Sequence, residues 1–269
     1  MRERSGADIL TREKQHHDRW AHELEIDQIM VKRSFEASTA PENRFILRKM
    51  GKLEDKRLLE VGCGVGEGSI YFTLKGARCT ATDYSTGILH KAKLLARKHK
   101  VTIETMRMNA EELHFPDGTF DYVYAANLLH HVRAETALRE MHRVCKPGGQ
   151  VCFWDPLKHN PIINVYRQIA HQVRSPDEAP LDIHFIDTVR TLFSEVSYET
   201  FWFLTLWIFV RFYLIERVSP NEQRYWKKII FEERRLRRTY MRLEWLDRYV
   251  KKLWFMERFA WNIAVVATK

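Results

Sequence analysis

An acidic residue followed by three regularly spaced glycines occurs near the front of the chain, where residues 58–66 read Leu-Leu-Glu-Val-Gly-Cys-Gly-Val-Gly. Glu60 lies in an apolar segment typical of a buried strand, and Gly62, Gly64 and Gly66 come directly after it. Glycines allow a tight turn and let the backbone approach a ligand closely. The motif predicts a cofactor site, and a triphosphate is disfavoured because no Lys-Ser/Thr pair follows the glycines.

A second acidic residue ends the next predicted strand. Residues 78–83 read Arg-Cys-Thr-Ala-Thr-Asp, so that Asp83 follows Glu60 by 23 residues. A carboxylate at this point of a nucleotide-binding fold can accept hydrogen bonds from both hydroxyls of a ribose. The two acidic residues therefore predict a cofactor that contains a ribose, although the glycine turn alone leaves a dinucleotide open.

Three later segments complete an ordered series. Residues 108–111 (Met-Asn-Ala-Glu) follow a third strand, and residues 120–125 form a fourth strand that leads to a pair of histidines. Residues 143–149 (Arg-Val-Cys-Lys-Pro-Gly-Gly) end a helix and lead into a fifth strand, 150–155. The series, over about residues 57–155, resembles the class I S-adenosylmethionine-dependent methyltransferases, in particular the branch of small-molecule enzymes that includes the quinone-biosynthesis methyltransferases.

The resemblance implies an α/β fold with a doubly wound, seven-stranded Rossmann-like sheet whose last strand is antiparallel, and S-adenosylmethionine as the cofactor. The three glycines would then contact the methionine part of the cofactor, and Glu60 would hold its ammonium group. Asp83 would take the ribose hydroxyls, and Tyr84 would lie near the adenine face. Asn109, with its neighbour Ala110, matches a position where the family more often has Asp, and an Asn carbonyl can still accept a hydrogen bond from the adenine amino group.

Residues after strands four and five are candidates for contact with the methyl acceptor, because ligands bind at the carboxyl ends of such strands. His131 and its neighbour His130 follow strand four, while Asp155 and His159 follow strand five. His131, Asp155 and His159 are the expected catalytic residues, and one histidine of the pair could instead cap a helix. A base is needed only if the acceptor must lose a proton. No metal site is expected.

The ends of the chain suggest additions to the methyltransferase core. Residues 196–201 and 261–268 read as strands six and seven, which places a helical insertion or cap at residues 204–258 between them. The core is expected to comprise residues 51–203 and 259–269. Residues 1–50 are expected to form a helical lid, in which His16, His17 and Trp20 could cover the cofactor.

The insertion concentrates the unusual composition of the chain. Residues 201–260 hold 14 Lys and Arg against 7 Asp and Glu, and 16 of the 33 aromatic residues. The apolar run 201–215 is shorter than the ~20 residues of a membrane-spanning helix. A basic amphipathic helix with apolar positions every three to four residues follows it. Two interpretations stay open, a cap over the pocket and a peripheral contact with an anionic membrane.

The expected function is methyl transfer to a hydrophobic small-molecule or lipid-linked acceptor. One alternative is a nucleic-acid methyltransferase that uses the basic insertion, which is less favoured because the aromatic residues lie within an apolar stripe. Another is a regulator that binds the cofactor without catalysis. Four isolated cysteines and an N-terminus without a secretory pattern favour a cytoplasmic protein with reduced thiols, which could be peripheral at the membrane.

Overall fold

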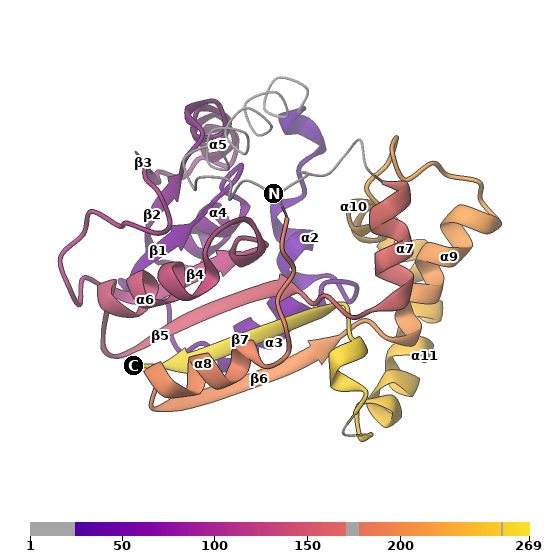
Figure 1. The fold of residues 1–269 in the computed structure, drawn as a ribbon. Helices are drawn as coiled ribbons and strands as arrows, with labels where there is room; N and C mark the ends of the chain where they lie inside the picture. The colour runs from indigo at the N-terminus through magenta and orange to yellow at the C-terminus, as the bar shows by residue number, and fades with distance from the viewer. Residues whose placement is uncertain (1–24, 171–177, 254) are drawn as a thin grey trace, which may run out of the picture.

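The computed structural model describes residues 25–170, 178–253 and 255–269. Seven strands form one sheet in the order β3-β2-β1-β4-β5-β7-β6, with β7 antiparallel to both of its neighbours, as the sequence predicted (Figure 1). The three predicted lid residues, His16, His17 and Trp20, lie outside the described residues. The strands are β1 (Arg57–Val61), β2 (Arg78–Asp83), β3 (Glu104–Arg107), β4 (Phe120–Ala126), β5 (Cys145–Pro156), β6 (Glu195–Phe201) and β7 (Asn262–Thr268).

Helices cover both faces of the sheet because alternate strand residues point to opposite sides. In β1, Leu58 joins one hydrophobic core while Leu59 and Val61 join the other. The four cysteines are all buried free thiols. The first core takes residues from α2 (Val31–Glu36), α3 (Pro41–Lys49), α4 (Glu67–Leu74) and α5 (Thr86–Lys98), and the second from α6 (Ala134–Val144) and α8 (Phe185–Leu192).

The segment between β6 and β7 is helical, as predicted, and gathers with α7 (Pro161–Ile169) beyond one end of the sheet (Figure 1). The basic amphipathic helix predicted after the apolar run is instead two helices, because the chain bends at Glu232, where ψ is 19°. This bend lets apolar residues of both helices reach the first core. The elements are η3 (Leu204–Leu206), α9 (Trp207–Leu214), α10 (Tyr225–Phe231), α11 (Glu233–Val250) and η4 (Glu257–Phe259).

The apolar run 201–215 contains both buried and exposed side chains. Phe209 and Phe212 are buried, whereas Trp207 and Leu214 are 56% and 65% exposed. Within the described part of the chain, no helix combines the length and the apolar character needed to cross a bilayer. The run therefore anchors the insertion through one side of α9 and leaves apolar surface on the other side.

A buried carboxylate fastens the insertion to the end of β6. Asp247 of α11 is 3% exposed and accepts hydrogen bonds from the backbone N–H of Leu204 at 2.7 Å and from Thr205 Oγ1 at 2.9 Å. Its Oδ2 also accepts longer bonds from the N–H groups of Phe203 and Thr205. These donors start η3, so Asp247 satisfies groups that would otherwise be buried without partners.

Replacing Asp247 by alanine should lower the free energy of unfolding by ~2–3 kcal/mol, because buried donors lose their acceptor. Urea denaturation at about 25 °C measures the change. Asp187→Ala is the control, because Asp187 is exposed in the first turn of α8 and its loss should cost less than about 1 kcal/mol. Equal losses in the two variants would contradict the fastening role of Asp247.

Candidate cofactor and acceptor site

A cavity of about 390 Å³ opens at the carboxyl ends of the central parallel strands. Its lining includes the glycine turn after β1, the end of β2 and the segment after β4. It also includes residues of α2, α3 and α7 and of the strand ends that flank the insertion. Parallel strands present their carboxyl ends at one edge of the sheet, so sequence motifs far apart along the chain meet here.

The glycine turn has the backbone conformation that its sequence predicts. Gly62, Gly64 and Gly66 have φ angles of 65°, 52° and 77°, in the left-handed region. A Cβ on Gly62 would be strained at this φ and would also lie 2.6 Å from Leu128 Cδ1, in the segment after β4, so that side chain would have to move. Gly66 is the N-cap of α4, which directs the first amides of that helix toward the cavity.

Glu60 is a buried carboxylate that lines this cavity. Its Oε2 accepts hydrogen bonds from the backbone N–H and the hydroxyl of Ser69, both at 2.6 Å. Burial raises the pKa of Glu60 to about 7, although the bonds from Ser69 oppose the shift. A Cβ on Gly68 would lie 2.2 Å from Glu60 Oε1. Glycine at position 68 therefore leaves room for the Glu60 carboxylate, and the alternating motif gave no signal for this.

Asp83 holds the turn in place. Its Oδ2 accepts a hydrogen bond from Gly64 N–H at 3.0 Å, and its Oδ1 accepts one from Ser85 N–H at 2.9 Å. Tyr84 also lines the cavity. The Arg107 guanidinium lies over its ring, 4.9 Å from the ring centroid, in a cation–π contact. The carboxylate thus lies at the edge where a ribose would meet the glycine turn.

Asn109 and Ala110 lie on the same cavity wall as Tyr84. Asn109 Oδ1 accepts a hydrogen bond from Glu111 N–H at 3.0 Å. This bond orients the amide group within its turn. A second bond from an adenine amino group would have to share that oxygen, which has two lone pairs.

His130 and Asp155 form a buried pair. His130 Nδ1 lies 2.6 Å from Asp155 Oδ1, and the carboxylate also accepts hydrogen bonds from the N–H groups of Leu129 and His130 at 3.1 Å. Asp155 is fully buried behind His130, and His130 is the member of the pair that lines the cavity. From the sequence, His131 and Asp155 were the predicted catalytic residues, and one histidine of the pair was expected to be able to cap a helix instead.

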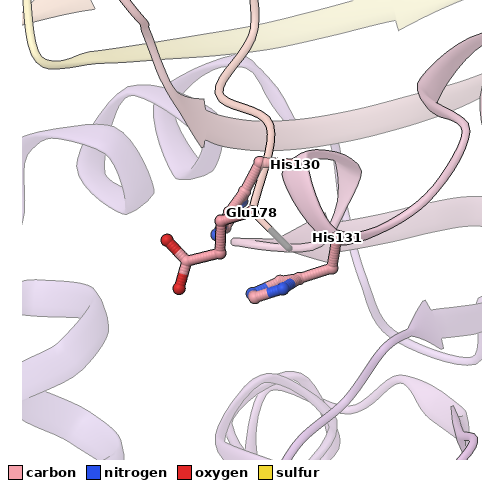
Figure 2. A group of neighbouring side chains, drawn as sticks. All are labelled: His130, His131 and Glu178. Atoms are coloured by element: carbon pink, nitrogen blue, oxygen red, sulfur yellow. The ribbon is translucent and has the colours of Figure 1, made fainter. Parts of the chain in front are cut away.

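A third side chain that could coordinate a metal ion lies beside the histidine pair. His130, His131 and Glu178 each offer one nitrogen or oxygen atom, and these atoms lie within 4.8 Å of one another (Figure 2). Figure 2 shows Glu178 reaching this group from a different part of the chain. Two imidazoles and a carboxylate can hold a divalent transition-metal ion, and the same groups can exchange a proton with an acceptor.

His159 lies apart from the cavity lining. Its Nε2 is 3.3 Å from Asp182 Oδ2, and the side chain is 46% exposed. Lys158 contacts the same carboxylate, and these contacts hold the pKa of Asp182 well below its usual range. Of the three predicted catalytic residues, the structure thus brings only His131 to the cavity wall.

Parts of this chain are similar in sequence to known proteins. Residues 59–153 match the family described as "Methyltransferase domain". Sterol 24-C-methyltransferase of Kluyveromyces lactis is 25% identical over 67% of this chain and 50% of its own length. Ubiquinone biosynthesis O-methyltransferase of Pseudomonas syringae is 37% identical over 40% of this chain and 47% of its own length. The chain thus spans about half the length of these relatives.

A solved structure supports the fold. An S-adenosylmethionine-dependent methyltransferase from Thermotoga maritima superposes with a TM-score of 0.53 and 20% identity, over 70% of this chain and 84% of its own. At this level of identity the match supports the fold alone. Residues 59–153 thus belong to a methyltransferase domain, and the sheet and the glycine turn agree with the class I S-adenosylmethionine-dependent methyltransferase fold.

Proposed function

We propose that the protein transfers the methyl group of S-adenosylmethionine to a hydrophobic small-molecule or lipid-linked acceptor. The observation that carries this proposal is that one cavity combines two kinds of wall. Glu60, Asp83 and the glycine turn supply polar groups suited to the cofactor, while Trp154 and Trp202 supply aromatic surface suited to an apolar acceptor. The two named relatives support the acceptor class, since sterols and ubiquinone precursors are hydrophobic.

The cofactor-facing residues fit the cofactor by charge and space. Glu60 would meet its ammonium group, because a buried carboxylate gains most from a cationic partner. Asp83 would accept the ribose hydroxyls, and Tyr84, Asn109 and Ala110 would flank the adenine. Bound there, S-adenosylmethionine supplies an electrophilic methyl group, so this chain chiefly has to align the acceptor with it.

His130 is the base that we assign for an acceptor that must lose a proton. In the tautomer that this role requires, Nδ1–H donates to Asp155 and Nε2 carries the lone pair. The buried carboxylate also stabilises the imidazolium that forms once the proton is taken. His131 and Glu178 lie beside this base and would orient the acceptor.

The insertion would place the cavity beside a membrane. On α11, residues spaced by three or four positions form one outward face opposite the buried Leu236 and Tyr240. That face carries both basic and apolar side chains, and within the described residues its three arginines make no ion pair. The face comprises Arg234, Arg238, Met241, Arg242, Trp245 and Tyr249, all of them exposed.

Binding of S-adenosylhomocysteine should release a proton from Glu60. The pKa of this carboxyl is raised to about 7, and an ammonium partner favours the charged form and lowers it again. In the free protein the same shift makes the stabilising contribution of Glu60 fall as pH rises from 4.5 to about 7. Calorimetry at about pH 6.5, in two buffers of different ionisation enthalpy, measures the released protons.

Glu60→Gln should abolish this proton release and weaken binding about tenfold or more. Glu54→Gln, a change at an exposed carboxylate outside the cavity, should leave both quantities at the wild-type value. Proton release that persists in Glu60→Gln would remove Glu60 from the cofactor site.

His130→Ala should lower turnover of a hydroxyl acceptor by about 10²–10⁴ while leaving affinity for S-adenosylhomocysteine near the wild-type value. Transfer from labelled S-adenosylmethionine to a panel of sterols, polyprenyl phenols and fatty acids measures the effect. His114→Ala is the control, because His114 is 70% exposed and lies outside the cavity lining. Removal of divalent ions with EDTA should not alter turnover. A chelator-sensitive rate would instead assign the histidine pair and Glu178 to a metal ion.

The outward face of α11 should bind vesicles that contain phosphatidylserine more tightly than vesicles of phosphatidylcholine. Each engaged basic residue contributes about 1 kcal/mol, so reversing Arg234, Arg238 and Arg242 to Glu together should reduce the vesicle partition coefficient about a hundredfold. Salt should weaken binding only in part, because insertion of Trp245 and Tyr249 is not screened. Cosedimentation measures the partition.

Reversal of Lys56, Arg97 and Lys100, which are exposed outside the insertion, is the matched control and should leave vesicle binding intact. Absence of vesicle binding at low salt would contradict the membrane contact. Binding to RNA with a steep salt dependence, without vesicle binding, would favour the nucleic-acid alternative.

A further inference from the structure

Three side chains from distant segments meet at one wall of the cavity. Glu42 comes from the first turn of α3, Trp202 follows β6 and Asn262 begins β7. Glu42 Oε1 accepts hydrogen bonds from Trp202 Nε1 at 2.5 Å and from Asn262 Nδ2 at 2.6 Å. All three line the cavity and are at most 6% exposed. A buried carboxylate therefore faces the same space as the cofactor residues.

The orientation of Asn262 leaves an acceptor for a ligand. Because its Nδ2 donates to Glu42, its Oδ1 must point to another side. Within the described part of the chain, this buried Oδ1 has no hydrogen-bond partner. Buried polar atoms are seldom left in that state in folded proteins, and because Asn262 belongs to the cavity lining, its unpaired oxygen points to a donor on a ligand.

The backbone at Trp202 is strained in a way that keeps this wall in place. Trp202 has a φ of 68°, a conformation that is uncommon for a bulky residue. Its carbonyl accepts a hydrogen bond from Trp261 N–H at 3.2 Å, and its indole N–H is held by Glu42. Strained residues persist where the surroundings enforce them, and they cluster at ligand sites.

The neighbouring wall is apolar and aromatic. Trp154 Nε1 already donates to Tyr124 Oη at 3.2 Å, and Tyr124 Oη donates to Asn43 Oδ1 at 2.7 Å. These polar atoms therefore hydrogen-bond to one another. Trp154, Trp261 and Tyr166 add aromatic rings to the cavity lining. A matching ligand carries a hydrogen-bond donor on an apolar ring.

We propose that Glu42 and Asn262 form a subsite that binds a hydroxyl group carried by an apolar ring of the methyl acceptor. This inference rests on the proposed function, because it takes the cavity to be the acceptor pocket. Asn262 Oδ1 can only accept a hydrogen bond, and an ether has no proton to donate to it. The subsite therefore selects hydroxylated rings against their ether counterparts.

Calorimetry on the full chain saturated with S-adenosylhomocysteine tests the subsite with two probes of similar shape, para-butylphenol and para-butylanisole. The phenol should bind about ten- to a hundredfold more tightly, because only the phenol can donate to buried acceptors. Equal affinity for the two probes, or no binding of either, would overturn the proposal.

Two variants assign the preference to the named residues. Glu42→Gln turns one carboxylate oxygen into a donor, and Asn262→Leu removes Oδ1, so each should reduce the phenol preference to less than about threefold. Glu36→Gln, at a carboxylate of α2 outside the cavity lining, is the matched control and should keep the full preference. A full preference in both cavity variants would also overturn the proposal.

The folding of each variant is checked by its affinity for S-adenosylhomocysteine, to which Glu42 and Asn262 are not assigned. Wild-type protein that binds S-adenosylhomocysteine but does not discriminate between the probes would contradict the proposed subsite and leave the proposed function standing. Wild-type protein that fails to bind S-adenosylhomocysteine would count against the proposed function itself. The two failures are therefore distinguishable.

Discussion

Burial of carboxylates at the edge of the sheet is the constraint on which the site depends, because a buried carboxylate must be hydrogen-bonded or neutralised. Glu60 meets this requirement through Ser69, which fixes the start of α4 against β1. Asp155 meets it through His130 and so orients an imidazole toward the cavity. Glu42 meets it through two side chains from either end of the insertion. Each of these bonds joins different elements of the fold, so the same contacts stabilise the fold and shape the cavity.

The helices of the insertion have a buried side that packs on the core and an exposed side. Inward, Asp247 holds α11 to the start of η3, and the buried sides of α9, α10 and α11 continue the core that α2 and α3 begin. Outward, α9 and α11 leave apolar and basic side chains exposed. A pocket with aromatic walls beside such a surface would let a hydrophobic acceptor reach the cofactor from a membrane with little exposure to water. The proposed acceptor class and the proposed membrane contact thus support each other.

Residues 57–155 were predictable because each motif combines a strand end with a residue that the turn requires, and the sheet, the glycine turn, Glu60 and Asp83 lie where the sequence placed them. The bend at Glu232 was not predictable, since apolar spacing continues through it. The role of Glu42 could not be predicted from a local motif, because its hydrogen-bond partners lie 160 and 220 positions away in the sequence. For the same reason, the choice between His130 and His131 depends on Asp155 behind them, a contact that local sequence does not encode.

The claim that Glu60, Asp83 and the glycine turn form an S-adenosylmethionine site is tested most directly by comparing cofactors on the unmodified protein. Calorimetric titration with S-adenosylhomocysteine and, separately, with NAD distinguishes the methyltransferase site from the dinucleotide site that a glycine turn alone would allow. We expect one S-adenosylhomocysteine to bind per chain, with a dissociation constant of about 10⁻⁶–10⁻⁴ M, near −8 to −5 kcal/mol, and no measurable heat with NAD. Binding of NAD without binding of S-adenosylhomocysteine would contradict it.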